Sequence, residues 1–348
     1  MDSHSSRTVA RAAVVPKSLS IVKITFGFGV TSTLGSPFSF ASRRPLLFLL
    51  HNPRPPISMD LTSSATLGLA INPGLKKTSL GVIGKNDLLI VGPGVLGRIV
   101  AEKWRQEHPD CQIWGQTMTT DHHDELIKSG IIPSLRGSEP YCKFPYVIFC
   151  APPYPTTDYP GDVRLALSNW SGEGSFLFTS STAVYDCSDN GFCNEDSPLV
   201  PVGKSPRTDV LLRAEKETLD AGGCVVRLAG LYKEDKGAHV YWSGKGTVDA
   251  RPDHILNLIH YEDAASLSVA IMKKKLRSQV FLGCDNHPLS RQEIMDYVNQ
   301  SGRFSNKFQG FTASDGPLGK RMNNSKTRAA LGWEPKFTSF SEFLGLIE

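Results

Sequence analysis

The sequence from residue 88 to residue 97 reads Leu88-Leu89-Ile90-Val91-Gly92-Pro93-Gly94-Val95-Leu96-Gly97. Its four continuous apolar residues predict a buried parallel strand, and the helical spacing of the apolar residues that follow predicts an amphipathic helix. The glycines between them form a G-x-G-x-x-G motif. In such a strand–turn–helix unit the first glycine permits a tight turn, the second lets a pyrophosphate approach the backbone, and the third lets the helix pack closely on the strand. We therefore expect dinucleotide phosphates at the start of this helix.

Further apolar runs separated by helical spacers follow this turn. The predicted strands lie at 112–117, 146–150, 176–178 and 224–228. This alternation predicts an α/β fold, a doubly wound parallel Rossmann sheet with a smaller C-terminal substrate-facing lobe. We place the Rossmann domain at 86–232 and the lobe at 233–348, a range that also holds part of the last helix and strand of the Rossmann domain.

The predicted cofactor is NAD(P), because ligands of such sheets lie beyond the carboxyl ends of the strands. An NAD-binding protein usually has Asp or Glu at the end of the second strand, whereas this chain has Thr117 there and no acid before Asp121. The missing acid gives a slight preference for NADP, although no Arg follows the strand either. The residues expected to bind the cofactor are Gly92, Pro93, Gly94, Val95, Leu96, Gly97, Arg98, Thr117, Ala151 and Pro152.

Four later segments add a family resemblance that spans roughly residues 87–345. The segments are Ser180-Ser181-Thr182-Ala183-Val184-Tyr185, Arg227-Leu228-Ala229-Gly230-Leu231-Tyr232, His260-Tyr261-Glu262-Asp263-Ala264-Ala265 and Leu331-Gly332-Trp333-Glu334-Pro335. In this order they resemble the motifs of atypical extended short-chain dehydrogenases/reductases, the NAD-dependent epimerase/dehydratase group. One departure is the glycine motif, which has one residue fewer between its first two glycines than is usual in that family.

A second departure concerns catalysis. The family uses a Tyr-x-x-x-Lys pair on the helix that leads to an Ala-Glu or Val-Glu step. Counting back from Ala214-Glu215 places Arg207 at the tyrosine position and Leu211 at the lysine position. A guanidinium stays protonated and cannot act as the acid/base in place of tyrosine. The resemblance leaves Ser181 as the candidate catalytic residue, although its hydroxyl could equally satisfy backbone groups. The expected substrate pocket contains Thr182, Tyr185, Arg207 and Tyr232, for which surface exposure or packing is the alternative.

The first 58 residues are rich in Ser, Arg and Pro and contain one acid, Asp2. This composition is typical of an organellar transit peptide, and we expect the chloroplast stroma, with the mitochondrion as the alternative. Residues 59–85 are interpreted as a linker. The apolar run at 45–50 is too short to cross a bilayer, so no membrane span is expected.

Charge and cysteine content exclude other classes of function. Residues 1–85 hold ten of the 38 basic and two of the 34 acidic residues, so the remainder has a net charge of −4 and no nucleic-acid footprint. The seven cysteines include no zinc-like spacing, so no metal is expected, although Cys187 and Cys193 could pair across a loop.

Two functions remain open. The first is an NAD(P)-binding protein with oxidoreductase or epimerase-like activity on an unknown small molecule. The alternative is a non-catalytic NAD(P)-binding sensor or assembly factor of the plastid. Substrate and oligomeric state do not follow from the sequence.

Overall fold

The computed structural model describes residues 83–137, 142–154 and 156–346, which all belong to one compact unit, Leu75–Glu348. The expected transit peptide at 1–58 and nearly all of the expected linker at 59–85 lie outside the described residues. Within the described ranges, no helix is long and apolar enough to span a membrane. The same ranges contain no cluster of three or more His, Cys, Asp or Glu side chains that could hold a metal ion.

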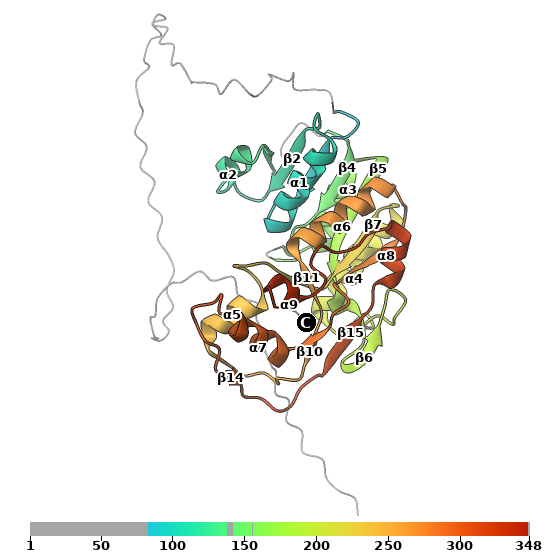
Figure 1. The fold of residues 1–348 in the computed structure, drawn as a ribbon. Helices are drawn as coiled ribbons and strands as arrows, with labels where there is room; N and C mark the ends of the chain where they lie inside the picture. The colour runs from blue at the N-terminus through green and yellow to red at the C-terminus, as the bar shows by residue number, and fades with distance from the viewer. Residues whose placement is uncertain (1–82, 138–141, 155, 347–348) are drawn as a thin grey trace, which may run out of the picture. The chain divides into compact units, whose positions relative to one another are not determined.

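A seven-stranded parallel sheet forms the centre of this unit (Figure 1). Its strands, in spatial order, are β12 (Val280–Gly283), β7 (Cys224–Leu228), β5 (Trp170–Ser181), β4 (Phe144–Phe149), β1 (Leu88–Val91), β2 (Ile113–Thr117) and β3 (Ile132–Leu135). All residues of β1, β4 and β7 are buried, as their continuous apolar runs predict. The predicted Rossmann fold is confirmed, and the strand order reverses between β1 and β4, where such sheets bind ligands.

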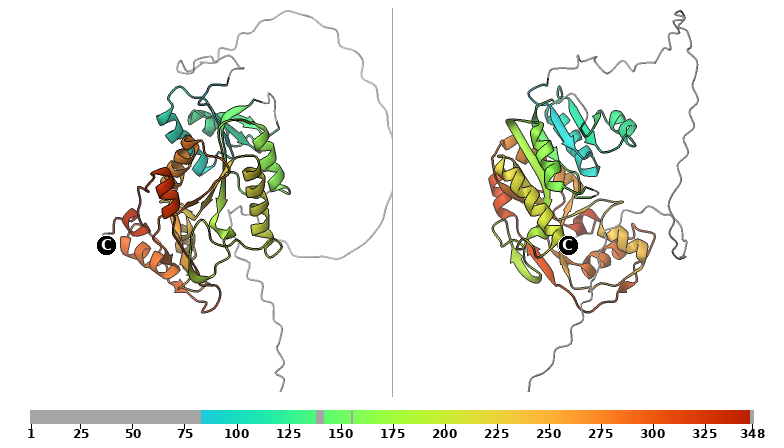
Figure 2. Two further views of the ribbon diagram at one scale, coloured as in Figure 1. Left: turned by 90° about the vertical axis from the view of Figure 1, so that its right-hand side faces the viewer. Right: turned by 180° about the vertical axis from the view of Figure 1, so that it is seen from behind.

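Helices cover both faces of this sheet (Figure 2). Helix α1 (Val95–Glu107) packs against α6 (Tyr261–Lys274) on one face, and α3 (Tyr159–Ser168) packs against α4 (Pro206–Asp220) on the other. Each helix buries one stripe; in α1 this stripe includes Leu96, Val100 and Trp104. Two short helices, α2 (His123–Lys128) and α8 (Ser325–Leu331), contact β3 and β12 respectively.

The smaller lobe is built from short strands and helices. A four-stranded sheet has the order β13 (Leu289–Ser290), β10 (Ile255–Leu256), β15 (Gly319–Met322) and β6 (Asp189–Cys193). Two strand pairs join β8 (Gly230–Tyr232) to β11 (Leu258–His260) and β9 (Thr247–Val248) to β14 (Gly310–Phe311). The remaining helices are α5 (Ala238–Lys245), α7 (Arg291–Ser301), α9 (Phe340–Phe343) and the 3-10 turn η1 (Thr182–Val184), which follows β5 directly.

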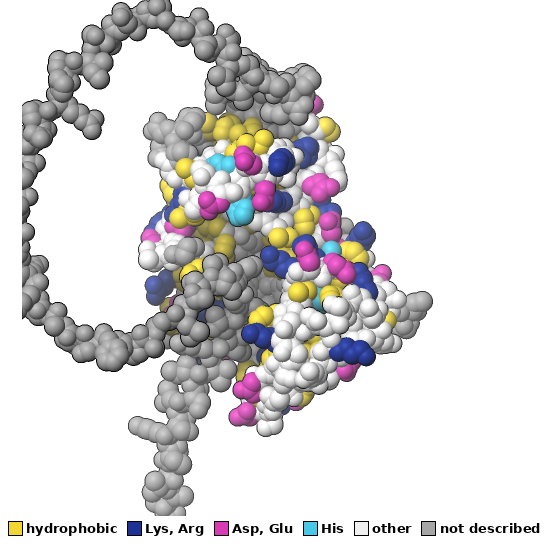
Figure 3. Space-filling view, turned by 90° about the vertical axis from the view of Figure 1, so that its left-hand side faces the viewer, with side chains coloured by type: hydrophobic (Ala, Val, Ile, Leu, Met, Phe, Trp, Pro, Cys, Tyr) yellow, Lys and Arg dark blue, Asp and Glu magenta, His cyan; other side chains and the backbone are white. Residues whose placement is uncertain are grey.

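The Rossmann layer and the smaller lobe each contain elements from both sides of residue 232. Strand β6 precedes residue 232 but pairs with β15 of the small sheet, whereas α6 and β12 follow residue 232 and belong to the Rossmann layer. The lobe is therefore anchored to the Rossmann layer at several points of the chain. On the face drawn in Figure 3, acidic and basic side chains of the described residues are interspersed.

Candidate nucleotide-binding site

The three glycines after β1 have three different surroundings. Gly92 has a φ of +78°, and a Cβ atom there would lie 2.6 Å from the Cα atom of Ala151, at the end of β4. At Gly97 a Cβ would lie 2.8 Å from Cγ2 of Ile90, so α1 packs directly on β1. Gly94, by contrast, has no atom within 4 Å of its Cβ position. Two glycines thus allow close packing, and the middle one borders open space.

The first turn of α1 presents backbone donors to that space. Gly94 is the N-cap residue and supplies no side-chain cap, and the turn contains no acidic side chain. Among the described residues, the amide groups of Val95, Leu96 and Gly97 have no hydrogen-bond acceptor. Unpaired N–H groups and the positive end of a helix dipole attract an anion, so this turn is chemically suited to a phosphate.

At the end of β2, the two residues predicted to reach the cofactor already have protein partners. The Thr117 hydroxyl donates to the Thr119 carbonyl at 2.8 Å and lies 2.8 Å from Nε2 of His123. Arg98 forms an ion pair with Glu125 at 2.9 Å, which lowers the pKa of that carboxyl group. Contact of Thr117 or Arg98 with a nucleotide stays a prediction.

The structure adds one cation that the sequence reading missed. Arg136 directly follows β3, its amide donates to the Thr117 carbonyl, and its guanidinium lies 3.6 Å from the sulfur of Met118 and pairs with Asp162. Sequence reasoning could have found Arg136, because neighbouring parallel strands end at the same edge of a sheet and a residue after β3 therefore lies near the end of β2. The sequence did not predict β3, so it gave no indication of the arginine that follows this strand.

The predicted contribution of β4 lies beside the glycine turn. Ala151 packs against Gly92, and its carbonyl accepts a 2.7 Å hydrogen bond from the hydroxyl of Tyr159 in α3. Pro152 follows as an exposed residue. The structure therefore brings Gly92, Gly94 and Ala151 together at the point where the strand order reverses.

Ser181 lies at the end of β5, where it caps η1. Its Oγ accepts a 3.2 Å hydrogen bond from the amide of Ala183, and its side chain is half-buried. The following turn is held by Lys320 of β15, whose Nζ donates to the carbonyls of Thr182 (3.0 Å) and Tyr185 (2.7 Å). Lys320 is a second residue that the sequence reading missed, because nothing in its local pattern connects it with this turn.

A buried ion pair lies next to the same turn. Glu215 of α4 accepts hydrogen bonds from Arg227 of β7, the shortest at 2.7 Å, and from the hydroxyl of Ser180 at 2.5 Å. Both charged side chains are at most 5% exposed. The guanidinium of Arg227 also lies 4.8 Å from the ring centre of Tyr185. The sequence motifs at 180–185 and 227–232 thus meet in one structural network with Glu215.

This network does not provide a phenolic base. Arg207 is exposed at the start of α4, and Leu211 is buried in the core. Tyr185 is 2% exposed, and burial raises its pKa to about 12, so the phenol stays protonated near neutral pH. Tyr232 is 1% exposed in the aromatic core of the smaller lobe, and burial raises its pKa strongly.

The predicted pocket residues therefore lie in different surroundings. Thr182 and Tyr185 are joined through Lys320, Arg207 lies on the surface, and Tyr232 packs against His260, Phe340 and Phe343. Packing, the alternative that the sequence left open, describes the state of Tyr232 in this structure. The role of these residues toward a substrate stays a prediction.

Comparison with solved structures supports this architecture, although no protein-family model and no curated protein matches the sequence. A conserved protein of unknown function from Silicibacter pomeroyi DSS is 22% identical, with a TM-score of 0.61 over 74% of this chain and 96% of that one. The dTDP-glucose 4,6-dehydratase of Bacillus anthracis strain Ames, solved with NAD, is 12% identical (TM-score 0.59, 74% and 95% covered). The UDP-glucuronic acid 4-epimerase of Bacillus cereus, also solved with NAD, is 15% identical (TM-score 0.59, 74% and 94% covered).

The dehydratase and the epimerase were both solved with NAD, so the slight preference for NADP expected from the sequence finds no support in them. Because these structures have low sequence identity to this chain, they show its fold alone. The chain thus has the fold of the NAD-dependent epimerases and dehydratases, the extended short-chain dehydrogenase/reductase architecture that the sequence motifs indicated.

Proposed function

We propose that this protein binds NAD or NADP, with the pyrophosphate against the first turn of α1. The observation that carries the proposal is the open space at Gly94 in front of the unpaired amides of residues 95–97. The close contacts at Gly92 and Gly97 fix the backbone of this turn, which supports a preformed site for a diphosphate. The NAD named for the dehydratase and the epimerase of the same fold supports the choice of ligand.

The edge at β2 bears on the choice between the two dinucleotides. The strand ends at Thr117 with no acidic residue before Asp121, and the cation Arg136 is paired with Asp162. Neither feature selects one cofactor, so the proposal is NAD(P). Replacement of Arg136 by Ala should weaken NADPH binding more than NADH binding if the guanidinium turns to a 2′-phosphate.

The proposed activity is an oxidoreductase or epimerase-like reaction on a small molecule. When bound, the nicotinamide supplies hydride exchange. Ser181 accepts a hydrogen bond from Ala183, and its own hydroxyl proton has no acceptor among the described residues, so it can donate to a substrate oxygen. Ser181 would then orient the substrate; the chain offers no Tyr-x-x-x-Lys pair at α4 for the proton transfer, since Arg207 and Leu211 stand there.

The lack of a Tyr-x-x-x-Lys pair at α4 favours the second candidate, a non-catalytic NAD(P)-binding sensor or assembly factor. A panel of nucleotide sugars and small carbonyl compounds separates the two candidates when oxidation or reduction of the nicotinamide is followed optically. Turnover that Ser181→Ala lowers while NADH affinity is kept supports the enzyme. Nucleotide binding without turnover on any compound supports the sensor.

The binding proposal is tested by titrating the purified full chain with NADH and NADPH and following their fluorescence. Gly94→Asp places a side chain and a negative charge in the open space and should abolish binding. Gly244→Asp is a matched control, because Gly244 also has no atom within 4 Å of its Cβ position and lies in α5 of the smaller lobe. Failure of the wild-type protein to bind either nucleotide at millimolar concentration contradicts the proposal.

We also propose a plastid location, on the composition of residues 1–58. A fusion of residues 1–58 to a fluorescent reporter should accumulate in chloroplasts. Signal confined to mitochondria supports the alternative, and signal confined to the cytosol contradicts both.

A further inference from the structure

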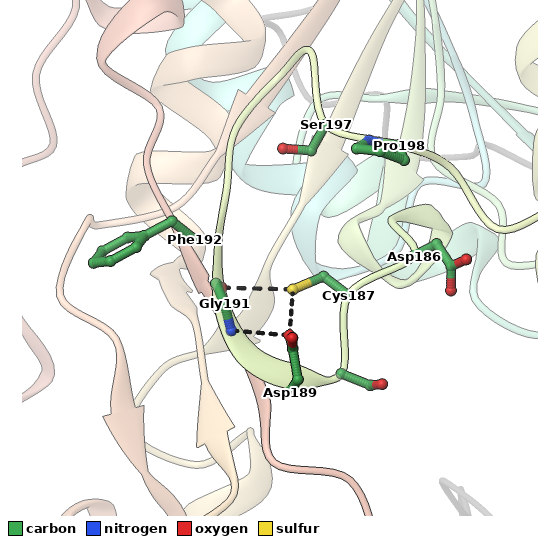
Figure 4. Close-up of a pocket in the computed structure, with 8 residues that line it drawn as sticks. Asp186, Cys187, Asp189, Gly191, Phe192, Ser197 and Pro198 are labelled. Atoms are coloured by element: carbon green, nitrogen blue, oxygen red, sulfur yellow. Dashed lines mark hydrogen bonds between the residues drawn. The ribbon is translucent and has the colours of Figure 1, made fainter.

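A pocket of about 410 Å³ lies in the loop between η1 and α4, and the side chain of Cys187 points into it (Figure 4). The Cys187 sulfur lies 3.4 Å from Oδ1 of Asp189 and 3.5 Å from the carbonyl oxygen of Gly191. Its side chain is half-buried, and all seven cysteines are free thiols in this structure. A small molecule that enters the pocket can therefore reach this thiol.

A second thiol lies on the inner side of the same loop. Side chains alternate along β6, and Phe192 is 87% exposed while its neighbour Cys193 is 2% exposed. Gly191 therefore faces inward with Cys193, and a Cβ atom at Gly191 would lie 3.3 Å from the Cys187 sulfur. Because Gly191 has no side chain, position 191 adds no side chain beside the Cys187 sulfur.

The positive charge of Lys320 acts on both thiols. Burial raises the pKa of Cys187 and of Cys193, and the Asp189 carboxylate raises that of Cys187 further, whereas the positive charge of Lys320 lowers both. Lys320 makes hydrogen bonds to the carbonyls of Thr182 and Tyr185. The pKa of each thiol stays raised overall, so the thiolates form mainly under alkaline conditions.

We propose that Cys187 and Cys193 form a reversible disulfide bond, with a small organic disulfide such as oxidised glutathione as the oxidant. The Cys187 thiolate attacks one sulfur of the oxidant, a mixed disulfide forms, and the first thiol leaves. The Cys193 thiolate then attacks the Cys187 sulfur, and the second thiol leaves. The two cysteines lose two electrons and two protons in total, and the oxidant is reduced to two thiols.

The bond would act on the turn that holds Ser181. The Cys187 amide donates to the Tyr185 carbonyl at 3.0 Å, and the same carbonyl accepts from Lys320. Movement of Cys187 toward Cys193 therefore pulls on the end of the turn. The inference does not depend on a bound dinucleotide, so it can fail or succeed separately from the proposed function.

The test uses the full chain under native conditions, incubated with oxidised glutathione at about pH 8.5, where thiolates form more readily. Free thiols are then alkylated, and the protein is cleaved before aspartate. Cleavage before Asp189 separates the two cysteines, so a linked pair of peptides proves the bond. The expected product is a Cys187–Cys193 bond that dithiothreitol removes, with the other cysteines alkylated.

Single variants test the order of attack. In Cys193→Ser, a glutathione adduct should accumulate on Cys187, whereas in Cys187→Ser the buried Cys193 should stay unmodified. Cys111→Ser is the matched control and should form the same bond as the wild-type protein. Full alkylation of both cysteines after oxidation, or a bond that forms only in denaturant, would overturn the proposal.

Discussion

Replacement of Asp285 by Asn should change how the stability of this protein depends on pH. Asp285 follows β12 and is 4% exposed. Its Oδ1 atom accepts a 2.9 Å hydrogen bond from the amide of His287, and its Oδ2 atom is buried without a partner among the described residues. Burial raises the pKa of this carboxyl group to about 8. Near neutral pH the folded protein therefore holds Asp285 as the neutral acid.

The sign and the size of the effect follow from linkage. An unfolded aspartate has a pKa of about 3.9, so the folded state binds one more proton than the unfolded state between about pH 4 and pH 8. Stability from this group is greatest below about pH 4 and is lost as pH rises through about 8. The slope is at most about 1.4 kcal/mol for each pH unit, and the change from about pH 6.5 to about pH 8 is therefore about 2 kcal/mol.

The pH range is chosen to avoid the histidines. Burial lowers the pKa of His239 and of His260 to about 4, so their contribution to stability rises between about pH 4 and pH 6.5 and opposes that of Asp285 there. Urea unfolding of the wild-type protein and of Asp285→Asn should be compared above that range. The stability of the variant relative to the wild type should increase by about 2 kcal/mol toward pH 8. A difference that stays constant with pH would refute the reasoning.

Two further substitutions test the framework of the site. Arg227→Met leaves the carboxylate of Glu215 buried and unpaired and should lower the free energy of unfolding by about 3–5 kcal/mol. The second substitution Glu215→Gln, added to Arg227→Met, should restore part of this loss. An unchanged loss in the double variant would contradict the assignment. An alanine at position 92 would be strained by the positive φ and would clash with Ala151, so Gly92→Ala should lower the melting temperature clearly. Gly244→Ala in helix α5 should not lower it. Equal melting temperatures for the two alanine variants would contradict the tight turn.

The Rossmann layer could be predicted from sequence because its information is local. A buried parallel strand reads as a continuous apolar run, and the predicted strand at 224–228 coincides with β7. The glycine turn is equally local, and Gly92 and Gly97 have the close contacts expected of them, whereas the approach of a pyrophosphate at Gly94 stays a prediction. Each of these features depends on residues that are neighbours in the chain.

The rest of the site depends on contacts between distant segments. Lys320 reaches the carbonyls of Thr182 and Tyr185 only because β15 pairs with β6, and both strands are too short to show a clear pattern. Arg136 was missed because β3, Ile132–Leu135, contains Pro133 and Ser134 and shows no continuous apolar run. Burial of Tyr232 follows from packing of α9, which no spacing around the tyrosine indicates.

Hydrogen exchange at the start of α1 tests the central claim most directly. The amides of residues 95–97 have no acceptor among the described residues, so they should exchange quickly in the free protein. Saturation with NADH should slow exchange in the peptide that covers residues 92–98, and Gly94→Asp should prevent this change. NADH that binds without protecting this segment would place the pyrophosphate elsewhere and contradict the account.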